Sequence, residues 1–467
     1  MGLLSRLIGG IRDMFFPSNK DIGKIFGVEL ISSDKMNYQI ERWDAISRGE
    51  PPWLDKEDDI RTVNMASTIS NYRARLTTLG VDIACSGSAR ADAIQKIIKK
   101  LLKQLPKKLP AADCVGGMII KWNGKSWDFV MNGQFGITAK DDDGNIRGAI
   151  FSDQAKQGGD TYTRLEYHRF ERDGLYYVSN KAFKNRRSAS GTMELGMEVP
   201  LTYVEAWADM LPETPGIANL ENPLFGYFRV PGSNKIDPDS PLGVSVFAGA
   251  EYELEAVDKA ISRKDGEVED SKHVTFTSQQ VVSGAAKKGV KLPRYVRSLG
   301  MGVNDADTSA IKEHVPTMLT DQRIKDINFD LSLAGVQCGF SEGVFVLDGQ
   351  TGMVTATQVE SDDRDTIQTI KDDRDALKDA IEEAIMGADA LMTLYNMAPL
   401  GDYELNFAFQ DITYNHEEDK QTWKYYVSQN WVPAWVFLMK FEGLTEEDAK
   451  AMTAEANPPS KGLFGVE

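Results

Sequence analysis

The residues GFSEG at 339–343 match the G-x-S-x-G pattern that carries the nucleophile of many serine hydrolases. In that motif the serine, here Ser341, becomes reactive because a strand leads into a sharp turn and a helix follows it. In this chain helical periodicity precedes the motif, and the strand-like residues VFVL (344–347) follow it. This order is the reverse of what the chemistry needs, so we expect no catalysis at Ser341.

Other patterns imitate ligand sites without completing them. The run GAAKKGV (284–290) begins like a phosphate-binding loop, but Val290 and Lys291 stand where that loop requires Lys-Ser/Thr. The run KDDDGN (140–145) lacks calcium ligands at the first and twelfth loop positions. None of the histidines lies at metal-ligand spacing from another His or Cys: His168, His273, His314 and His416. We therefore expect no enzyme, no cofactor and no metal site.

The composition is that of an acidic globular protein. The chain has 467 residues, of which 42% are hydrophobic and 26% charged, with a formal net charge of −17. This length can bury a sizeable core and predicts two to three lobes. The excess of carboxylates argues against a nucleic-acid clamp, because tight DNA binders neutralise phosphates with clustered Lys and Arg. No apolar run approaches the roughly 18 residues of a membrane span.

The cysteines indicate the redox compartment, and the N-terminal residues indicate a contact with another molecule. Cys85, Cys114 and Cys338 are odd in number and widely spaced, which favours buried thiols in a reducing compartment. The N-terminal MGLLSRLIGGIRDMFF is mildly amphipathic but lacks a clean signal-peptide pattern, and Arg6 stands where myristoylation needs Ser or Thr. We interpret this stretch as an arm that packs on a neighbouring molecule.

Periodicity divides the first half of the chain into helices and then strands. Helices are predicted over 58–80 and 92–104. From 115 to 205, short alternating runs punctuated by Asn-Gly and Asp-Gly predict a mostly antiparallel sheet. The Pro-rich stretch 207–240 is expected to be an extended link. The second helix carries neighbouring lysines, which form either a solvated face or a docking patch for an acidic neighbour: Lys96, Lys99, Lys100 and Lys103.

A strongly signalled helix is predicted to begin at residue 241. Ser240 is a good N-cap, because its hydroxyl can accept a hydrogen bond from an orphan backbone N–H, and Pro241 suits the first helical position. One apolar face follows at helical spacing: Val244, Phe247, Leu254, Val257 and Ile261.

An insertion and two further helices are predicted next. The run HVTFTSQQVV (273–282) predicts a strand, 283–316 has no clear period, and 317–337 predicts a second helix. A Gly-rich excursion at 339–355 leads to a long helix over about 356–395. Residues 360–383 hold ten Asp or Glu against four Lys or Arg. Such charge usually marks a solvated helix face, although in a ring this face could look into a shared channel.

The last part of the chain is predicted to be α+β. The run YELNFAF (403–409) alternates like a strand, and Thr445 with Asp448 forms a capping-box-like start for a final helix. Between them lies a helical segment whose aromatic residues we interpret as core and not as a base-stacking platform: Trp423, Tyr426, Trp431 and Trp435.

The order and spacing of these segments resemble the portal proteins of tailed bacteriophages, of the siphophage type. The block NPLFGYFRVPGSNKIDPDSPLGVSVF (222–247) is similar to the family's lead-in to the helix that lines its ring. The resemblance covers most of the chain, through TVNMASTISNYRARLTTLGVDI (62–83), VGGMIIKW (115–122), LEYHRF (165–170), YYVSNKAF (176–183), TATQV (355–359), DITYNHEEDKQTW (411–423) and GLTEEDA (443–449).

This resemblance implies an α+β fold: a portal-like subunit with an α/β wing, two stem helices flanking a small β-containing clip, and a long helix after a tunnel loop. Because the chain is short after the long helix, any crown must be small or merged with the wing. The implied divisions are an N-terminal wing (1–240), first stem helix (241–271), clip (272–316), second stem helix (317–338), tunnel loop (339–355), long helix (356–398), C-terminal wing or crown (399–456) and flexible tail (457–467).

The function implied by the resemblance is that of a ring of about twelve copies, a conduit at the capsid vertex for genome packaging and ejection. Implied partners are other copies of the chain, the terminase large subunit, the head–tail connector, the major capsid and scaffold proteins, and double-stranded DNA passing without sequence specificity. No membrane partner is expected. The protein would reside in the virion, and in the host cytoplasm during assembly. A mostly negative or neutral wall would let DNA slide, because like charges prevent sticking.

Two groups of residues follow from the resemblance as candidate sites. The tunnel loop would present Asp348, Gln350, Thr351 and Met353 to DNA, and an ordinary surface loop explains them equally well. The clip would offer a basic rim to a partner or to entering DNA, unless these residues only keep a loop soluble: Lys287, Lys288, Lys291, Arg294 and Arg297. The alternatives to a portal are another ring-forming phage protein of the tail or baseplate and, less favoured, a serine hydrolase using Ser341.

Overall fold

The chain divides into two compact units, Met1–Ala408 and Phe409–Glu467. The computed structural model describes residues 19–31, 33–54, 60–187, 193–270, 274–277, 279–289, 296–298, 311–314, 319–347, 364–410, 416–429, 431–442 and 444–456. Helices and mainly antiparallel sheets occupy separate stretches of this part, which confirms the predicted α+β class.

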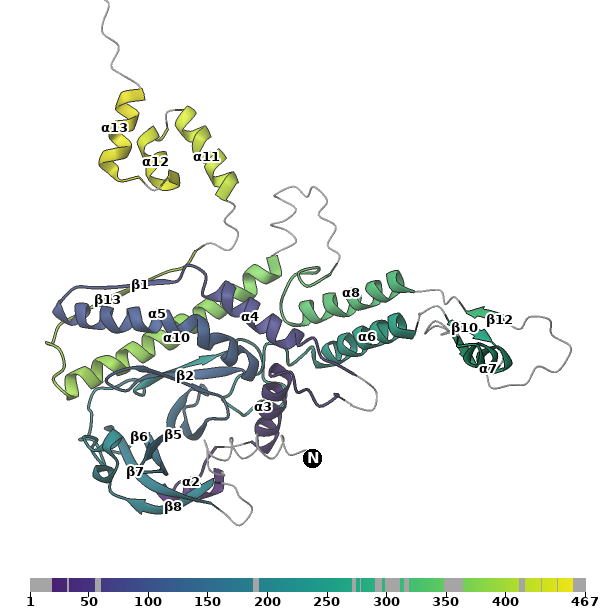
Figure 1. Ribbon diagram of the computed structural model, residues 1–467. Helices are drawn as coiled ribbons and strands as arrows, with labels where there is room; N and C mark the ends of the chain where they lie inside the picture. Colours follow the sequence, from purple (N-terminus) through teal and green to yellow (C-terminus); the bar gives the residue numbers. More distant parts are fainter. Residues whose placement is uncertain are drawn as a thin grey trace, which may run out of the picture. The chain divides into compact units, whose positions relative to one another are not determined.

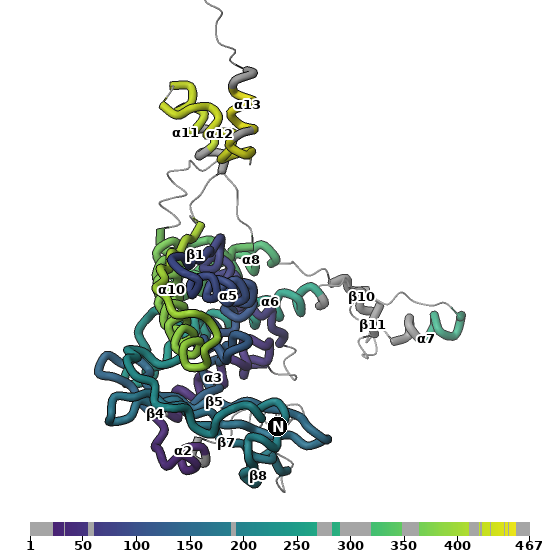
Figure 2. The backbone as a smooth tube through the Cα atoms, turned by 90° about the vertical axis from the view of Figure 1, so that its left-hand side faces the viewer, coloured from purple at the N-terminus to yellow at the C-terminus, as the bar shows by residue number. Residues whose placement is uncertain are grey.

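The core of the first unit is a three-stranded sheet packed against long helices (Figure 1). Its strand order is β3-β2-β9, with β2 in the centre and antiparallel to both neighbours. The helices α5 and α10 run side by side over it (Figures 1 and 2). The elements of this layer are α3 (Asp34–Ser47), α4 (Met65–Thr77), α5 (Ala89–Val115), β2 (Gly117–Trp122), β3 (Trp127–Met131), β9 (Phe225–Arg229) and α10 (Arg364–Leu394).

Glycines allow α10 to lie directly on the sheet. A Cβ on Gly226 of β9 would collide with the backbone carbonyl of Ala380 in α10, and one on Gly387 would lie 2.7 Å from the carbonyl carbon of Leu224. Gly387 is buried in the middle of α10 and does not interrupt it, so this helix runs for 31 residues. A small pair of antiparallel strands, β1 (Asp82–Ser86) and β13 (Glu404–Ala408), completes the layer.

The second sheet of this unit is a five-stranded meander, which agrees with the mostly antiparallel strands predicted over 115–205, although β2 and β3 of that range belong to the first sheet. Its order is β4-β5-β6-β7-β8, all antiparallel, and the predicted turn glycines Gly144 and Gly174 have φ of 87° and 78°. The helix α2 (Asn19–Phe26) covers one face through Ile22, which packs with Ile150 and Leu165 (Figure 2). The strands are β4 (Phe135–Lys140), β5 (Ile146–Gln157), β6 (Asp160–Phe170), β7 (Tyr176–Arg187) and β8 (Met193–Val199), followed by short 3-10 turns η1 (Leu201–Tyr203) and η2 (Glu205–Trp207).

The helix predicted to start at residue 241 is α6, and it begins only at Glu251 and ends at Asp270. Residues 241–250 form loops and turns instead. Their backbone N–H groups find partners outside a helix: Gly243 N–H donates to the hydroxyl of Tyr227, and Val246 N–H donates to the carbonyl of Asp113. Ser240 caps only a local turn, at the N–H of Leu242.

Several other predicted boundaries are wrong for local reasons. The helix predicted over 58–80 is α4, which begins at Met65 after a left-handed Asn64 cap. The one predicted over 92–104 is the longer α5, capped by Ser88 and ended by Gly116 in the left-handed region. The stretch 207–240, expected to be only a link, contributes strand β9.

The described part of the second unit consists of three helices. They are α11 (His416–Ser428), α12 (Ala434–Glu442) and α13 (Glu446–Ala456). The predicted cap is confirmed, since Asp448 N–H donates to the Thr445 hydroxyl, which donates in turn to the Asp448 carboxylate. The predicted aromatic core is only partly formed. Trp423 packs edge-on against Phe441, but Trp431 is 67% exposed.

Candidate functional site

Two antiparallel helices of the first unit, α6 and α8 (Thr320–Gln337), bound the insertion predicted as a clip, and they lie side by side (Figures 1 and 2). At the centre of the pair, Val257 of α6 packs with Ile327 and Leu331 of α8. The helix predicted over 317–337 therefore agrees closely with α8, and α6 is shorter than the helix predicted from residue 241.

Polar contacts close both ends of this helix pair. At one end the Gln337 amide donates to Glu253 at 3.0 Å. At the other, Glu267 accepts the backbone N–H of Leu319 at 3.1 Å and Nε of Arg323 at 3.1 Å, and these two donors lower the pKa of Glu267. The end of α6 and the start of α8 are thus held together where the chain leaves for the insertion and returns from it.

The carboxylates of α6 are largely used inside the subunit. Glu251 accepts hydrogen bonds from Nε of Arg42 at 2.6 Å and from the indole of Trp43 at 2.8 Å. Asp258 is buried and accepts the indole N–H of Trp53 at 2.9 Å. Acidic residues of this helix therefore attach it to the N-terminal segment and do not form a free acidic wall.

Among the described residues of the helices α6, α8 and α10, the exposed carboxylates lie on the last two. On α8 these are Asp321 and Asp326, and the outer face of α10 carries Asp365, Asp372, Asp375 and Asp379. The opposite face of α10 is apolar and packs on β2 and β9. The solvated face predicted for the long helix is thus present on a helix that is also part of the core.

Hydrogen bonds hold together the two segments that flank residues 348–363. Thr369 of α10 donates its hydroxyl to the carbonyl of Gly339 at 2.7 Å. Ser341 N–H donates to the Thr366 hydroxyl at 2.8 Å, and that hydroxyl donates to Oγ of Ser341 at 3.0 Å. The first residues of the loop predicted over 339–355 are therefore packed and hydrogen-bonded to the start of α10.

The same contacts define the environment of Ser341. This residue is 5% exposed and follows the helix α8 and a short turn, not a strand. The residues VFVL (344–347) form turns and not the strand that their composition suggested. Ser341 thus acts as a structural link between α8 and α10, and the geometry of a nucleophile elbow is absent from this described segment.

A buried ion pair lies beneath this junction. Arg73 of α4 donates from Nε and Nη2 to the carboxylate of Asp373 in α10, both at 2.7 Å, and from Nη1 to the carbonyl of Cys338 at 3.1 Å. Burial and the nearby Asp373 raise the pKa of Asp113 well above its ordinary value. One guanidinium therefore connects α4, the end of α8 and the start of α10.

All three cysteines are buried and free, as their spacing predicted. Burial raises the pKa of Cys114 to about 11 and that of Cys338 to about 12. These thiols are thus poor nucleophiles and poor metal ligands at neutral pH.

The insertion contains a small sheet and a helix. The sheet has the order β11-β10-β12, with β10 parallel to β11 and antiparallel to β12. The strand predicted over 273–282 is correct only for its first part, because a helix follows it directly. The elements are β10 (Val274–Thr277), α7 (Gln279–Lys287), β11 (Val296–Ser298) and β12 (Ile311–His314).

The predicted site residues are described only in part. Lys287 and Lys288 are exposed at the end of α7, and Arg297 is in β11 opposite Phe276. The other predicted residues lie outside the described part of the chain, as do the N-terminal arm and the tail: Lys291, Arg294, Asp348, Gln350, Thr351 and Met353.

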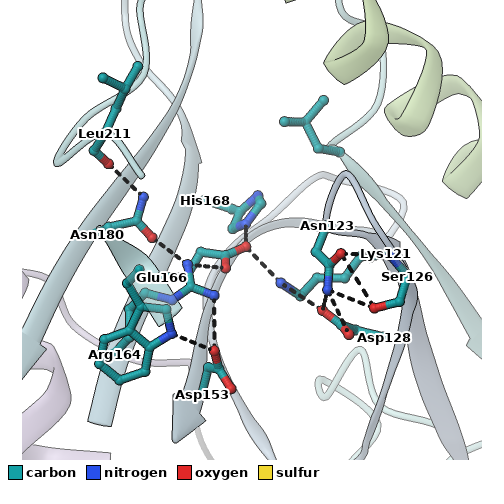
Figure 3. Close-up of polar contacts among 12 residues, drawn as sticks. Lys121, Asn123, Ser126, Asp128, Asp153, Arg164, Glu166, His168, Asn180 and Leu211 are labelled. Carbon is teal, nitrogen blue, oxygen red and sulfur yellow. Dashed lines mark hydrogen bonds and ion pairs between the residues drawn. The ribbon is translucent and has the colours of Figure 1, made fainter. Parts of the chain in front are cut away.

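A second polar cluster, which the sequence did not indicate, joins the two sheets (Figure 3). Its centre is Glu166 of β6, whose carboxylate accepts Nζ of Lys121 at 2.7 Å and Nη1 of Arg164 at 2.8 Å. Nε2 of His168 contacts the same carboxylate, and Nδ1 of His168 lies 2.8 Å from the hydroxyl of Tyr176. Lys121 belongs to β2, so this ion pair connects the three-stranded and five-stranded sheets.

The charges of this cluster compensate one another. Burial opposes ionisation of Glu166, but Lys121, Arg164 and His168 outweigh it and hold its pKa well below the ordinary value. Burial lowers the pKa of His168, and Glu166 offsets that effect only in part. A cavity of about 650 Å³ adjoins the cluster and has lining residues of both signs, including Asp128. This balance favours a structural tie over a site for a charged ligand.

Comparison with known proteins assigns the chain to no group. No known protein family matches it, and no curated protein matches it either. Among the described helices, none is both long and apolar enough to cross a membrane.

Proposed function

We propose that this protein is the ring-forming portal of a tailed bacteriophage, a non-enzymatic conduit for double-stranded DNA at the capsid vertex. The observation that carries this proposal is the antiparallel pair of α6 and α8, which brackets a small sheet and is attached to a mixed α/β body. The segment that follows α8 is fixed at both ends and leads into the long helix α10.

An exposed apolar stripe on α8 supports self-association. Phe329, Leu333 and Val336 lie at i, i+4 and i+7, on a face turned away from α6, and they are 68%, 37% and 49% exposed. Apolar side chains grouped in this way mark an interaction surface. In a head-to-tail ring, one copy's stripe would pack against the neighbouring copy.

Charge favours the outer face of the neighbour's α6 as the surface that receives this stripe. Near the stripe, α8 exposes Asp321 and Asp326, with the exposed Lys325 between them. The outer face of α6 exposes the aromatic Tyr252, which is 78% exposed, and about three turns further along it exposes Arg263. Opposite charges around an apolar centre are the usual composition of a protein interface.

The conduit would hold DNA weakly. The exposed carboxylates of α8 and α10 repel phosphates, so a bore lined by them would prevent sticking. The partners would be the terminase large subunit during packaging and the head–tail connector afterwards, both at the insertion, with capsid and scaffold proteins around the ring. The protein would then reside in the virion.

Electron microscopy of the purified protein tests the ring. Annular particles with a central hole support the proposal, and a monomer at high concentration would overturn it. The variant Phe329→Ser/Leu333→Ser should give folded monomers without rings. The matched control, Met197→Ser/Leu400→Ser, changes side chains that are 75% and 79% exposed elsewhere and should leave rings intact.

Removal of the insertion separates a portal from other ring proteins. Because Glu267 and Leu319 are hydrogen-bonded, a short Gly-Ser linker can join α6 to α8 in place of residues 272–318. This variant should still form rings but lose binding to its cognate terminase large subunit. Loss of the rings themselves would show that the insertion has been misassigned and would favour a different assembly component.

A further inference from the structure

One surface of this acidic chain is positively charged. The helix α5 exposes every one of its lysines, and α4 adds the exposed Arg75. Among the described residues none of these cations forms an ion pair, and Arg75 rests against the ring of Tyr72 at 5.3 Å. The lysines are Lys96, Lys99, Lys100, Lys103, Lys107 and Lys108.

Carboxylates are nearly absent from the same two helices. The sequence of α4 contains no Asp or Glu. In α5 only Asp92, in the first turn, is exposed, because the other carboxylate, Asp113, is 2% exposed. Within a chain of net charge −17, this surface is therefore a concentrated positive region.

A polar groove runs between these two helices. It has a volume of about 710 Å³ and is lined by Ser67, Thr68 and Asn71 of α4 and by Pro106 and Pro110 of α5. Side chains three or four residues apart share a helix face, so Lys103 and Lys107 lie on the face that contains these prolines. Hydroxyl and amide groups thus line the groove together with the apolar Val63 and the ring of Tyr72, and cations flank it.

We propose that this α4–α5 surface binds the phosphate backbone of duplex DNA without regard to sequence. From Lys96 to Lys108 the helix rises about 18 Å, which corresponds to roughly five base pairs of duplex. Lys and Arg together with Ser, Thr and Asn supply most protein contacts to phosphates. The inference does not depend on the proposed ring, whose bore is expected to hold DNA weakly.

The scarcity of exposed apolar residues favours DNA over an acidic protein as the partner. Between residues 64 and 115 no large hydrophobic side chain is exposed, and at the edge of the groove only Val63 is, at 37%. A protein interface normally has an apolar or aromatic centre. A DNA-backbone interface is polar and positively charged throughout.

The experiment measures binding of the full-length protein to a short fluorescein-labelled duplex of random sequence, by anisotropy, between about 50 and 200 mM salt. The test variant is Lys99→Gln/Lys103→Gln/Lys107→Gln. The control, Lys35→Gln/Lys156→Gln/Lys235→Gln, removes the same charge from exposed lysines on other elements. Gln and Lys have similar helix propensities, so α5 should fold in the test variant.

We expect the test variant to bind at least about tenfold more weakly, and the slope of log K against log salt to fall by about three. The control should bind like the unmodified protein, and the matching Lys→Arg variant should retain binding. Equal binding by test and control variants, or no binding by the unmodified protein at low salt, would overturn the inference. If the test variant keeps DNA binding but loses ring formation, the surface contacts a protein and the inference is wrong.

Discussion

Removing one partner of the buried ion pair between Arg73 and Asp373 is expected to cost about 3–5 kcal/mol of unfolding free energy. The side chains are only 7% and 2% exposed, and their two N–O distances are both 2.7 Å. In Asp373→Asn the guanidinium stays buried and loses the carboxylate that accepts two of its hydrogen bonds, and Asp113 remains as a nearby acidic group without a hydrogen bond to it. Water can compensate only in part, from the cavity of about 430 Å³ that Arg73 lines, because both side chains are otherwise buried.

Urea denaturation followed by tryptophan fluorescence measures this cost, provided that the slope against urea is unchanged. The double variant Arg73→Met/Asp373→Leu replaces both charges with apolar side chains and should recover most of the lost stability. A matched control is Glu194→Gln, which breaks the ion pair with Arg186. That pair is 48% and 70% exposed, so its loss should cost less than about 1 kcal/mol.

Two results would refute this reasoning. One is a cost for Asp373→Asn no greater than that of the exposed control. The other is additivity, in which the double variant loses the sum of both single losses to within about 0.5 kcal/mol. Either result would mean that water or other groups solvate Arg73, and that the joint between α4, α8 and α10 does not depend on this pair.

Three further outcomes follow from the structure. Burial lowers the pKa of His168 below its ordinary 6.5, so near this pH the unfolded chain binds a proton that the folded chain excludes. The free energy of unfolding should therefore fall as the pH drops below about 6.5. In His168→Gln the urea midpoint should depend less on pH over this range. The pKa of Asp113 is raised, so the folded chain retains a proton that the unfolded chain releases above about pH 3.8. Asp113→Asn should therefore stabilise the protein near pH 7. The gain in melting temperature should vanish towards about pH 4. Gly226→Ala should destabilise by about 1–3 kcal/mol or more, because its Cβ would meet the Ala380 carbonyl, whereas Gly249→Ala meets only an ordinary contact and serves as the control in the same melts.

Periodicity and turn chemistry predicted the elements well where the local signal was unambiguous. The meander from β4 to β8, the helix α8 and the strand β13 were all expected from alternation, helical spacing and Asn-Gly or Asp-Gly turns. The start of α6 was predicted wrongly. The cap signal at Ser240 was a genuine turn, but the next residues donate their N–H groups to Tyr227 and Asp113, which lie far away in sequence. A local pattern cannot reveal such tertiary partners.

The buried ion pairs were also missed, although a signal for one of them was present. Arg73 lies between Ile69 and Leu76 on the buried face of its helix. On α10, Asp373 interrupts the stripe in the same way, between Ile370 and Leu377. A charge on an apolar stripe, matched by the opposite charge on another stripe, indicates a buried pair. By contrast, no spacing rule links Lys121 to Glu166 across two sheets.

The distribution of charge in the fold limits what net charge can indicate about DNA. A formal charge of −17 suggested a protein that repels phosphates everywhere. In the structure, however, carboxylates of α6 such as Glu251 and Asp258 form anchoring contacts inside the subunit. On α10, Asp373 is buried, and exposed carboxylates lie on one solvated face. The helices α4 and α5 retain exposed Lys and Arg side chains with almost no exposed carboxylate of their own, although Lys108 lines the cavity that also contains Asp128 and Glu166. Because electrostatic attraction to DNA acts within about a Debye length, roughly 10 Å at 0.1 M salt, each surface interacts according to its own charge. An acidic subunit can therefore repel DNA at one face and hold it at another.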